Sequence, residues 1–372
     1  MINSLGGSGG AEHGLVREVT RFSGDTEQRV VRLFEKDHLD DRLTSAGIEV
    51  IGLDLTGGRA GWNWPYAARR IGGIIKTYRP DVIHSSLFTS NLVAQMAARR
   101  AGTPVISTFT LSGDVELLRS YQPGAQSWRA ATLRRLAART ARHPSIHFRA
   151  LTHDALVTNC MLLGIPPSRA TVIPRGVELD LLPTERKSHQ DLGLPSSEFL
   201  LVNVGRQTAQ KGHLSLLDAF EIVRTHVDAH LAIVGREGDS TERLHAEIEV
   251  RGLDPHVTLV GYTRDVHQYM AHADVFVFTS FMEGLGTAVL EAMAMALPVV
   301  AYDIPPVREV TDHGRVAQLV ELGDSQSFAQ TVLEVLSGGV DVSGQLEWVE
   351  QHFAIDSIAA RVESLLGQVA GS

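Results

Sequence analysis

Two glutamates stand eight positions apart in the stretch SFMEGLGTAVLEAM, residues 280–293. Glu283 lies in a glycine-containing turn after an apolar run, and Glu291 lies about one helical turn inside the segment that follows. Carboxylates placed in this way can accept hydrogen bonds from two hydroxyl-bearing parts of one ligand, such as a sugar and a ribose flanking a diphosphate. The alternative is a carboxylate that complements a helix dipole beside an unrelated loop glutamate.

A second group of charged residues follows the apolar run FLLVNVG. Arg206 and Lys211 occupy the turn RQTAQKG, just before a helical pattern that starts near His213. Fixed cations beside helix N-terminal amides favour an anion, so this turn is predicted to bind a diphosphate. Two surface cations on an ordinary loop would give the same pattern, and the glutamates further along the chain favour the binding site.

The elements that position these residues alternate along the chain. Short runs such as TPVIST, FLLVNVG and DVFVFTS are separated by segments such as NLVAQMAARRAG, whose apolar residues recur at helical spacing. This alternation predicts the α/β class, with parallel sheets that helices cover on both faces. Ligands of such sheets bind beyond the carboxyl ends of the strands, where both charged turns are expected.

The length of 372 residues and the apolar content of 44% fit two domains. The stretch IPRGVELDLLPTERKSHQDLGLP loses its apolar periodicity near the middle of the chain. The predicted organisation is a first Rossmann-like domain over residues 1–178, a linker over 179–195, a second Rossmann-like domain over 196–350, and a C-terminal helix over 351–372 that packs back toward the first domain.

The net charge of -9 is unevenly distributed. Residues 1–182 carry 22 basic and 16 acidic residues, whereas the remainder carries 12 and 27. A basic first half suits an acidic substrate or an anionic membrane, although an ordinary solvated surface has the same composition. No RNA-binding strand pattern or zinc-finger spacing is present, so nucleic acid is not an expected partner. The single cysteine, Cys160, and the lack of an export signal favour a cytoplasmic protein.

Four segments together resemble the retaining glycosyltransferases of glycosyltransferase family 4: GGAE, VIPRGVE, GRQTAQKG and EGLGTAVLEAMAMALPVVA. The similarity extends over nearly the whole chain. It implies the GT-B fold, in which two Rossmann-like parallel-sheet domains face each other across a cleft. It also implies transfer of a sugar from a nucleoside-diphosphate sugar to a glycan, lipid-linked or small-molecule acceptor, with retention at the anomeric carbon.

The resemblance assigns the donor to the second domain. Arg206 and Lys211 would bind the donor diphosphate and, with Glu283 on the donor-sugar hydroxyls, would form the catalytic group. Glu291 would bind the nucleotide ribose. The other residues assigned to the sugar, the phosphates or the base are Gly205, Tyr262, Thr263, Gly284, Leu285, Gly286 and Thr287.

The resemblance assigns the acceptor and the first loop to the first domain, where the candidate residues are Gly9, Gly10, Glu12, His84, Thr110 and Arg175. Thr110 follows a strand after which many relatives have a histidine. Arg175 stands where asparagine is usual, either as an added contact for an acidic acceptor or as a hinge residue. The glycine-rich loop also fits a flexible linker, and His84 also fits a structural histidine.

The resemblance implies that Arg206, Lys211 and helix amides stabilise the leaving nucleoside diphosphate. The sequence has no Asp-x-Asp run on a strand-end loop and no cluster of metal ligands at suitable spacing, so neither metal nor cofactor is expected. Attack from the face of the departing group needs no protein nucleophile, which leaves Glu283 a positioning and electrostatic role. The alternatives are a nucleotide-sugar 2-epimerase of the same architecture and a non-catalytic partner protein.

A basic helix is predicted over the segment SWRAATLRRLAARTAR in the first domain. Its cations lie beside leucines, which makes it a candidate for peripheral contact with the inner face of an anionic membrane, although a solvated helix face fits as well. These cations are Arg129, Arg134, Arg135, Arg139 and Arg142.

The first glycine-rich loop begins after only five residues, MINSL. In a Rossmann-like domain this loop follows a strand of about five or six residues inside the sheet. We therefore expect the natural polypeptide to begin several residues upstream of Met1 with apolar β-formers. The alternative is a shortened first strand.

Overall fold

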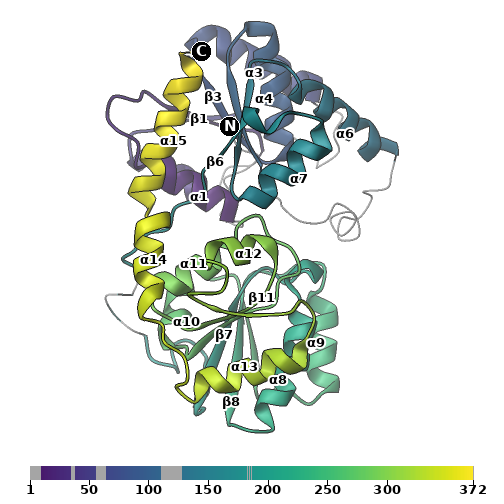
Figure 1. Ribbon diagram of the computed structural model, residues 1–372. Helices are drawn as coiled ribbons and strands as arrows, with labels where there is room; N and C mark the ends of the chain where they lie inside the picture. The colour runs from purple at the N-terminus through teal and green to yellow at the C-terminus, as the bar shows by residue number, and fades with distance from the viewer. Residues whose placement is uncertain are drawn as a thin grey trace. The chain divides into compact units, whose positions relative to one another are not determined.

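The computed structural model describes residues 10–34, 38–55, 64–109, 128–181, 183, 185 and 187–371. The chain divides into two compact units (Figure 1). Unit 1 comprises the chain up to Gly176 and the segment from Ile355 onward, and unit 2 comprises Val177–Ala354. Residues predicted as a linker belong to unit 2, where the Tyr269 hydroxyl donates a hydrogen bond of 3.0 Å to the Leu192 carbonyl.

Unit 2 is built on a six-stranded parallel sheet in the order β12-β11-β10-β7-β8-β9. Its strands are β7 (Phe199–Val204), β8 (Ala229–Val234), β9 (Val257–Gly261), β10 (Val275–Phe278), β11 (Val299–Tyr302) and β12 (Gln318–Val320). Its helices are η3 (Ala209–Lys211), α8 (His213–Arg224), α9 (Thr241–Val250), α10 (Val266–His272), α11 (Thr287–Ala294), α12 (Pro305–Val310), α13 (Ser325–Leu336) and α14 (Ser343–Phe353). The strand order reverses between β7 and β10.

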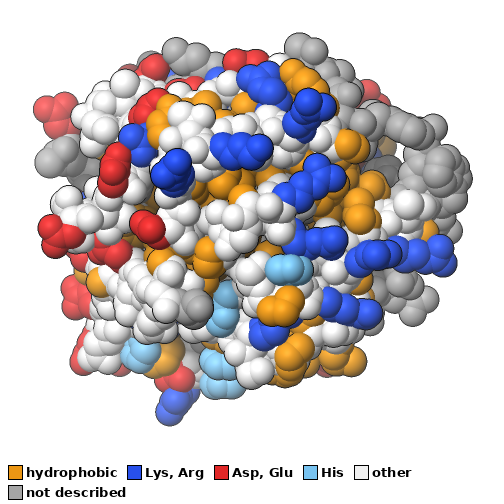
Figure 2. Space-filling view, turned by 90° about the horizontal axis from the view of Figure 1, so that it is seen from above, with side chains coloured by type: hydrophobic (Ala, Val, Ile, Leu, Met, Phe, Trp, Pro, Cys, Tyr) orange, Lys and Arg blue, Asp and Glu red, His pale blue; other side chains and the backbone are white. Residues whose placement is uncertain are grey.

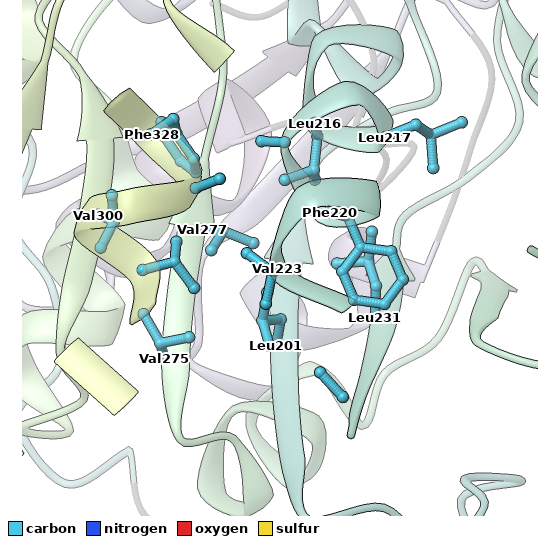
Figure 3. Packing of buried hydrophobic residues seen from close by; sticks show 14 of the residues in the cluster. Leu201, Leu216, Leu217, Phe220, Val223, Leu231, Val275, Val277, Val300 and Phe328 are labelled. Atoms are coloured by element: carbon cyan, nitrogen blue, oxygen red, sulfur yellow. The ribbon is translucent and has the colours of Figure 1, made fainter. Parts of the chain in front are cut away.

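The main core of unit 2 joins the central strands to two helices. Leu201 and Val277 of the strands pack against Phe220 of α8 and Phe328 of α13 (Figure 3). Each fully buried side chain of this size contributes about 1.5–3 kcal/mol relative to exposure to water. The apolar runs that mark the strands in the sequence therefore fix the positions of the turns at their carboxyl ends.

Unit 1 contains a two-stranded parallel sheet and a four-stranded parallel sheet in the order β3-β4-β5-β6. The strands are β1 (Arg29–Arg32), β2 (Glu49–Gly52), β3 (Ile83–Ser86), β4 (Val105–Phe109), β5 (Ile146–Ala150) and β6 (Ala170–Val172). The helices are α1 (Gly10–Val19), α2 (His38–Ser45), α3 (Trp64–Tyr78), α4 (Phe88–Ala101), α6 (Trp128–Ala141), α7 (His153–Leu163), η2 (Pro167–Arg169) and α15 (Ile355–Ala370).

The C-terminal helix α15 packs on the sheet of unit 1. Ile358, Val362 and Leu365 join Ile106 of β4 and Ile173 in one buried cluster. This packing gives the last segment of the chain a place in the same unit as the first 176 residues.

Within the described residues, the sheet of unit 1 is interrupted between β1 and β3. A cavity of about 670 Å³ lies there, lined by β1, β3, α1, α3 and α15, and apolar side chains such as Val31, Ile75 and Ile83 form part of its wall. The strand expected before the first glycine-rich loop lies outside the described residues.

Candidate active site

The Lys211 ammonium and the Glu283 carboxylate meet at one edge of the unit 2 sheet. Nζ of Lys211 lies 2.5 Å from Oε1 of Glu283, and the two side chains are 19% and 13% exposed. The turns that carry them follow β7 and β10, which pair directly. The pair therefore lies where the strand order reverses, the usual ligand site of an open parallel sheet.

Hydrogen bonds hold these two turns together. The Phe281 amide donates to the Gln210 carbonyl over 2.9 Å, and Nε2 of Gln210 donates to the Met282 carbonyl over 2.6 Å. Gly212 has φ +67, and a Cβ there would lie 2.0 Å from the Thr279 carbonyl oxygen. Only glycine permits this approach of the two backbones. Gln210 is a site residue that the sequence analysis did not identify, because nothing local marks a glutamine as a tether.

The side chain of Lys211 is supported along its length. A Cβ at Gly205 would lie 3.2 Å from Cδ of Lys211, so the glycine gives the aliphatic stem room. Nζ lies 5.4 Å from the centre of the Phe278 ring, within range of a cation–π interaction. The ammonium is thus directed by the ring and by Glu283 together.

Arg206 differs from Lys211 in its surroundings. Its side chain is exposed on the turn after β7, and within the described ranges it has no ion-pair partner. The two cations predicted to act together therefore comprise one preorganised ammonium and one guanidinium at the surface.

Three buried polar atoms at the same edge of the sheet have no hydrogen-bond partner in the part of the chain that the structure describes: Oε1 of Gln207, Nδ1 of His213 and Oγ of Ser280. Nε2 of His213 lies 3.0 Å from Oδ1 of Asn203, which can only accept, so Nδ1 carries the free lone pair. Burial lowers the pKa of His213 to about 3, which keeps the ring neutral. Buried polar atoms in folded proteins are nearly always bonded, so these three are candidates for bonds to a ligand or to water.

Glu291 and the helix N-terminus complete this group. Gly286 caps α11 with φ +88, α11 begins at Thr287, and Glu291 lies one turn further along with 9% exposure. Nε2 of His267 on α10 lies 3.9 Å from Oε2 of Glu291. His267 is a second residue that sequence reasoning missed, since a lone histidine gives no signal. Leu285 is 3% exposed, so its side chain packs in the interior.

Tyr262 and Thr263 follow β9, and β8 lies between β9 and β7 in the sheet. The Tyr262 ring is 52% exposed, as a platform for a flat ligand would be. Oγ1 of Thr263 accepts a hydrogen bond of 3.0 Å from the Asp265 amide, which shapes the loop.

In unit 1, Gly10 and Glu12 form the first turn of α1, and Glu12 is 9% exposed. His84 lies beside the neighbouring strand, with Nε2 2.8 Å from Oγ1 of Thr108. Burial and the nearby Arg149 hold the pKa of His84 well below its ordinary value. Gly9 and Thr110, the other two predicted residues of this group, lie outside the described residues.

Arg175 is 6% exposed and lies against α1. Its Nη1 donates a hydrogen bond of 2.7 Å to the Gly10 carbonyl, and its Nη2 lies 3.4 Å from Oγ of Ser86. Both contacts lie within unit 1. In the described ranges, no group of three or more His, Cys, Asp or Glu side chains is placed to hold a metal ion.

Both units match known protein families. Residues 10–176 match the family described as Glycosyl transferase 4-like domain, and residues 198–338 match the family described as Glycosyl transferases group 1. Together the two matches span most of the chain and leave out residues 1–9, 177–197 and 339–372.

Individual relatives and a solved structure extend this likeness. The chain is 26% identical over 367 residues to 2-deoxystreptamine N-acetyl-D-glucosaminyltransferase of Streptomyces fradiae, a match that covers 93% of this chain and 81% of that protein. It is 27% identical over 273 residues to UDP-Gal:alpha-D-GlcNAc-diphosphoundecaprenol alpha-1,3-galactosyltransferase of Escherichia coli, covering 70% and 68%. The crystal structure of Anabaena Alr3699/HepE in complex with UDP and glucose has a TM-score of 0.80 at 22% identity, covering 98% of each chain. The GT-B fold predicted from the sequence is confirmed.

Proposed function

The chain belongs to the group 1 glycosyltransferases, and we propose that it moves a sugar from a nucleoside-diphosphate sugar to an acceptor hydroxyl with retention at the anomeric carbon. The observation that carries this proposal is the Lys211–Glu283 pair at the strand-order reversal, surrounded by buried polar atoms without partners in the described residues. Fixed charge and free hydrogen-bonding groups at this position suit a sugar diphosphate.

Lys211 is the group that stabilises the departing diphosphate. An ammonium has three N–H donors, so a bond to Glu283 leaves two for phosphate oxygens. Charge that develops on the leaving group is best stabilised by donors already held in place, as Lys211 is held by Glu283 and Phe278. Arg206 adds an exposed cation on the same turn.

Glu283 and Glu291 position the donor from its two ends. Glu283 accepts hydrogen bonds from the sugar hydroxyls while it orients Lys211, and Glu291 accepts from the ribose. The acceptor hydroxyl attacks from the face that the diphosphate leaves, so no side chain forms a covalent bond to the sugar.

A UDP-sugar is the first donor to test, because two of the relatives named above carry UDP or UDP-Gal in their names. UDP at 100 times its Kd should stabilise the protein by roughly 2.7 kcal/mol, seen as a rise in Tm. The rise should disappear in Lys211→Ala and persist in the control Glu247→Gln, whose carboxylate pairs with Arg251 on the surface.

Turnover with the donor so identified tests the reaction itself. We expect a glycosylated product whose anomeric configuration matches that of the donor, and we expect turnover to continue in EDTA because lysine and helix amides replace a metal. An epimerised donor without glycosylated product would contradict transfer. Loss of activity in EDTA that manganese restores would contradict the metal-independent mechanism.

We propose a lipid-linked acceptor and peripheral contact with an anionic membrane at its inner face. Arg134, Arg135 and Arg139 are exposed on α6, which packs against α7. On α7, Val157, Met161 and Leu162 are 52%, 79% and 45% exposed. Figure 2 shows Lys and Arg side chains gathered with hydrophobic ones on one side of the face in view. Basic and apolar groups side by side suit an anionic lipid surface.

Among the described helices, none has both the length and the apolar character needed to cross a bilayer. The proposed contact therefore concerns the surface of α6 and α7. The protein should sediment with anionic vesicles and stay in solution with neutral ones. Changing Arg134, Arg135 and Arg139 to glutamate, or Met161 to glutamate, should abolish sedimentation. The control Val250→Glu alters an equally exposed apolar residue of unit 2 and should have no effect. Equal binding to neutral vesicles would end the proposal.

A further inference from the structure

The Arg175 side chain runs across the first turns of α1. It leaves the backbone just after β6, and a Cβ added at Gly14 would lie 2.6 Å from its Cδ and 3.1 Å from its Nε. At the far end, Nη1 donates to the Gly10 carbonyl over 2.7 Å. Arg175 therefore contacts α1 at both Gly10 and Gly14, and Gly14 has no side chain to obstruct the arginine.

A second buried arginine holds the backbone from which Arg175 projects. Nε of Arg149 donates to the Ile173 carbonyl over 2.8 Å, and its Nη2 donates to the Pro174 carbonyl. Both terminal nitrogens of Arg149 also donate to the Glu18 carboxylate, each over 2.7 Å. Glu18 lies one turn beyond Gly14, so α1 is tied to the segment 173–175 at successive turns.

We propose that Arg175 is a positioning residue, which fixes the first turn of α1 and with it the backbone amides at the helix N-terminus, and that residue 14 is glycine to admit it. The proposal rests on the sugar-transfer function proposed above, because that function supplies a substrate that can bind at the first turn of α1. Unpaired amides at a helix N-terminus are donors for an anionic or carbonyl group, so their position sets how well the substrate binds.

The geometry separates this role from direct contact with substrate. Arg175 is 6% exposed, so its guanidinium is directed into the protein. Burial lowers its pKa to about 10, and it therefore stays protonated at neutral pH, where the carboxylates of Glu18 and Glu12 attract it. A charged group that is buried and shared between α1 and Ser86 orients the helix rather than a ligand.

The test of the packing is Gly14→Ala in two backgrounds. With Arg175 present, the added methyl group must displace a buried arginine, and the Tm should fall. With Arg175→Asn, the space is open and the higher helix propensity of alanine should raise the Tm by about 2–4 °C relative to that background. The same response to Gly14→Ala in both backgrounds would overturn the proposal.

The kinetic readout is the split between KM and kcat. Arg175→Asn should raise the KM of the substrate that meets α1 by up to about tenfold, the scale of one weakened hydrogen bond. Arg175→Lys keeps the positive charge but lacks the planar guanidinium with its two terminal NH2 groups. Its KM should therefore lie between those of the unaltered protein and of Arg175→Asn. UDP binding to unit 2, followed by thermal shift, should be unchanged. Loss of activity toward anionic acceptors alone, without any effect of Gly14→Ala, would instead assign Arg175 to substrate contact. Absence of binding to uridine, guanosine and adenosine diphosphates alike in the unaltered protein would count against the sugar-transfer function.

Discussion

Lys211→Ala and Glu283→Gln should each lower the rate of sugar transfer by about 100-fold or more and leave the fold intact, the usual scale for loss of one preorganised electrostatic contact. Lys211→Ala removes the cation that meets the leaving group. Glu283→Gln keeps the shape of the side chain but removes the charge that directs the ammonium, whose Nζ lies 2.5 Å from Oε1. The measurement is steady-state turnover with a saturating donor, alongside circular dichroism of both variants.

Because the two residues form one unit, their losses should not multiply. The double variant should be about as slow as Lys211→Ala alone. Glu247→Gln is the matched control, since Glu247 also pairs with a cation in unit 2, Arg251, but lies on α9 away from both turns. Near-normal turnover in either single variant would remove that residue from the mechanism.

Glu18→Ala should destabilise unit 1 by about 3–5 kcal/mol, because it leaves a buried guanidinium without its carboxylate. Arg149 is 1% exposed and Glu18 is 2% exposed, so the pair is shielded from bulk water in the folded protein. Glu18→Leu combined with Arg149→Met should recover most of the stability, since apolar groups of similar size often replace a buried ion pair at little cost. Comparing the stability of Glu18→Ala with that of the double variant separates the cost of the unpaired charge from the cost of the lost packing.

Hydrogen exchange gives a measurement specific to each unit. Amides of β5 should lose protection in Glu18→Ala, whereas amides of β7 in unit 2 should serve as an internal reference and stay unchanged. Glu49→Ala, which breaks the exposed pair with Arg29, should change stability by less than about 1 kcal/mol. Equal effects of Glu18→Ala and Glu49→Ala would show that the buried pair has no special role.

Five strands of unit 2, β7 to β11, were predictable because their side chains are mostly apolar, whereas the three-residue β12 was not predicted. FLLVNVG and DVFVFTS correspond to β7 and β10, and the helix predicted around Glu291 is α11. A parallel strand covered on both faces needs such a run, so local sequence alone reveals it.

Three strands of unit 1, β1, β2 and β5, are not among the predicted runs, and β1 and β5 each carry a buried arginine. Arg32 in β1 is 4% exposed and pairs with Asp40, and Arg149 in β5 is 1% exposed and pairs with Glu18. Each arginine breaks the apolar run, and its partner lies elsewhere in the chain. Local periodicity cannot reveal a charge that a distant residue compensates.

In the candidate site, too, some features follow from local sequence and others depend on residues far apart in the chain. Lys211 and Glu283 could be singled out from residue type and turn context, but their contact depends on the pairing of β7 with β10, which α8, α9 and α10 separate in the sequence. The tether made by Gln210 and the burial of Ser280 follow from that pairing too. The sequence therefore predicted the candidate residues, and the topology determined how they meet.

The cavity between β1 and β3 lies where the two sheets of unit 1 come near each other. In the described part of the chain β1 pairs with β2 and β3 pairs with β4, and residues of both β1 and β3 line the cavity. The edges of parallel sheets are templates on which a further strand can pair. One additional parallel strand between them would join the two sheets of unit 1 into a single continuous one and remove both templates at once.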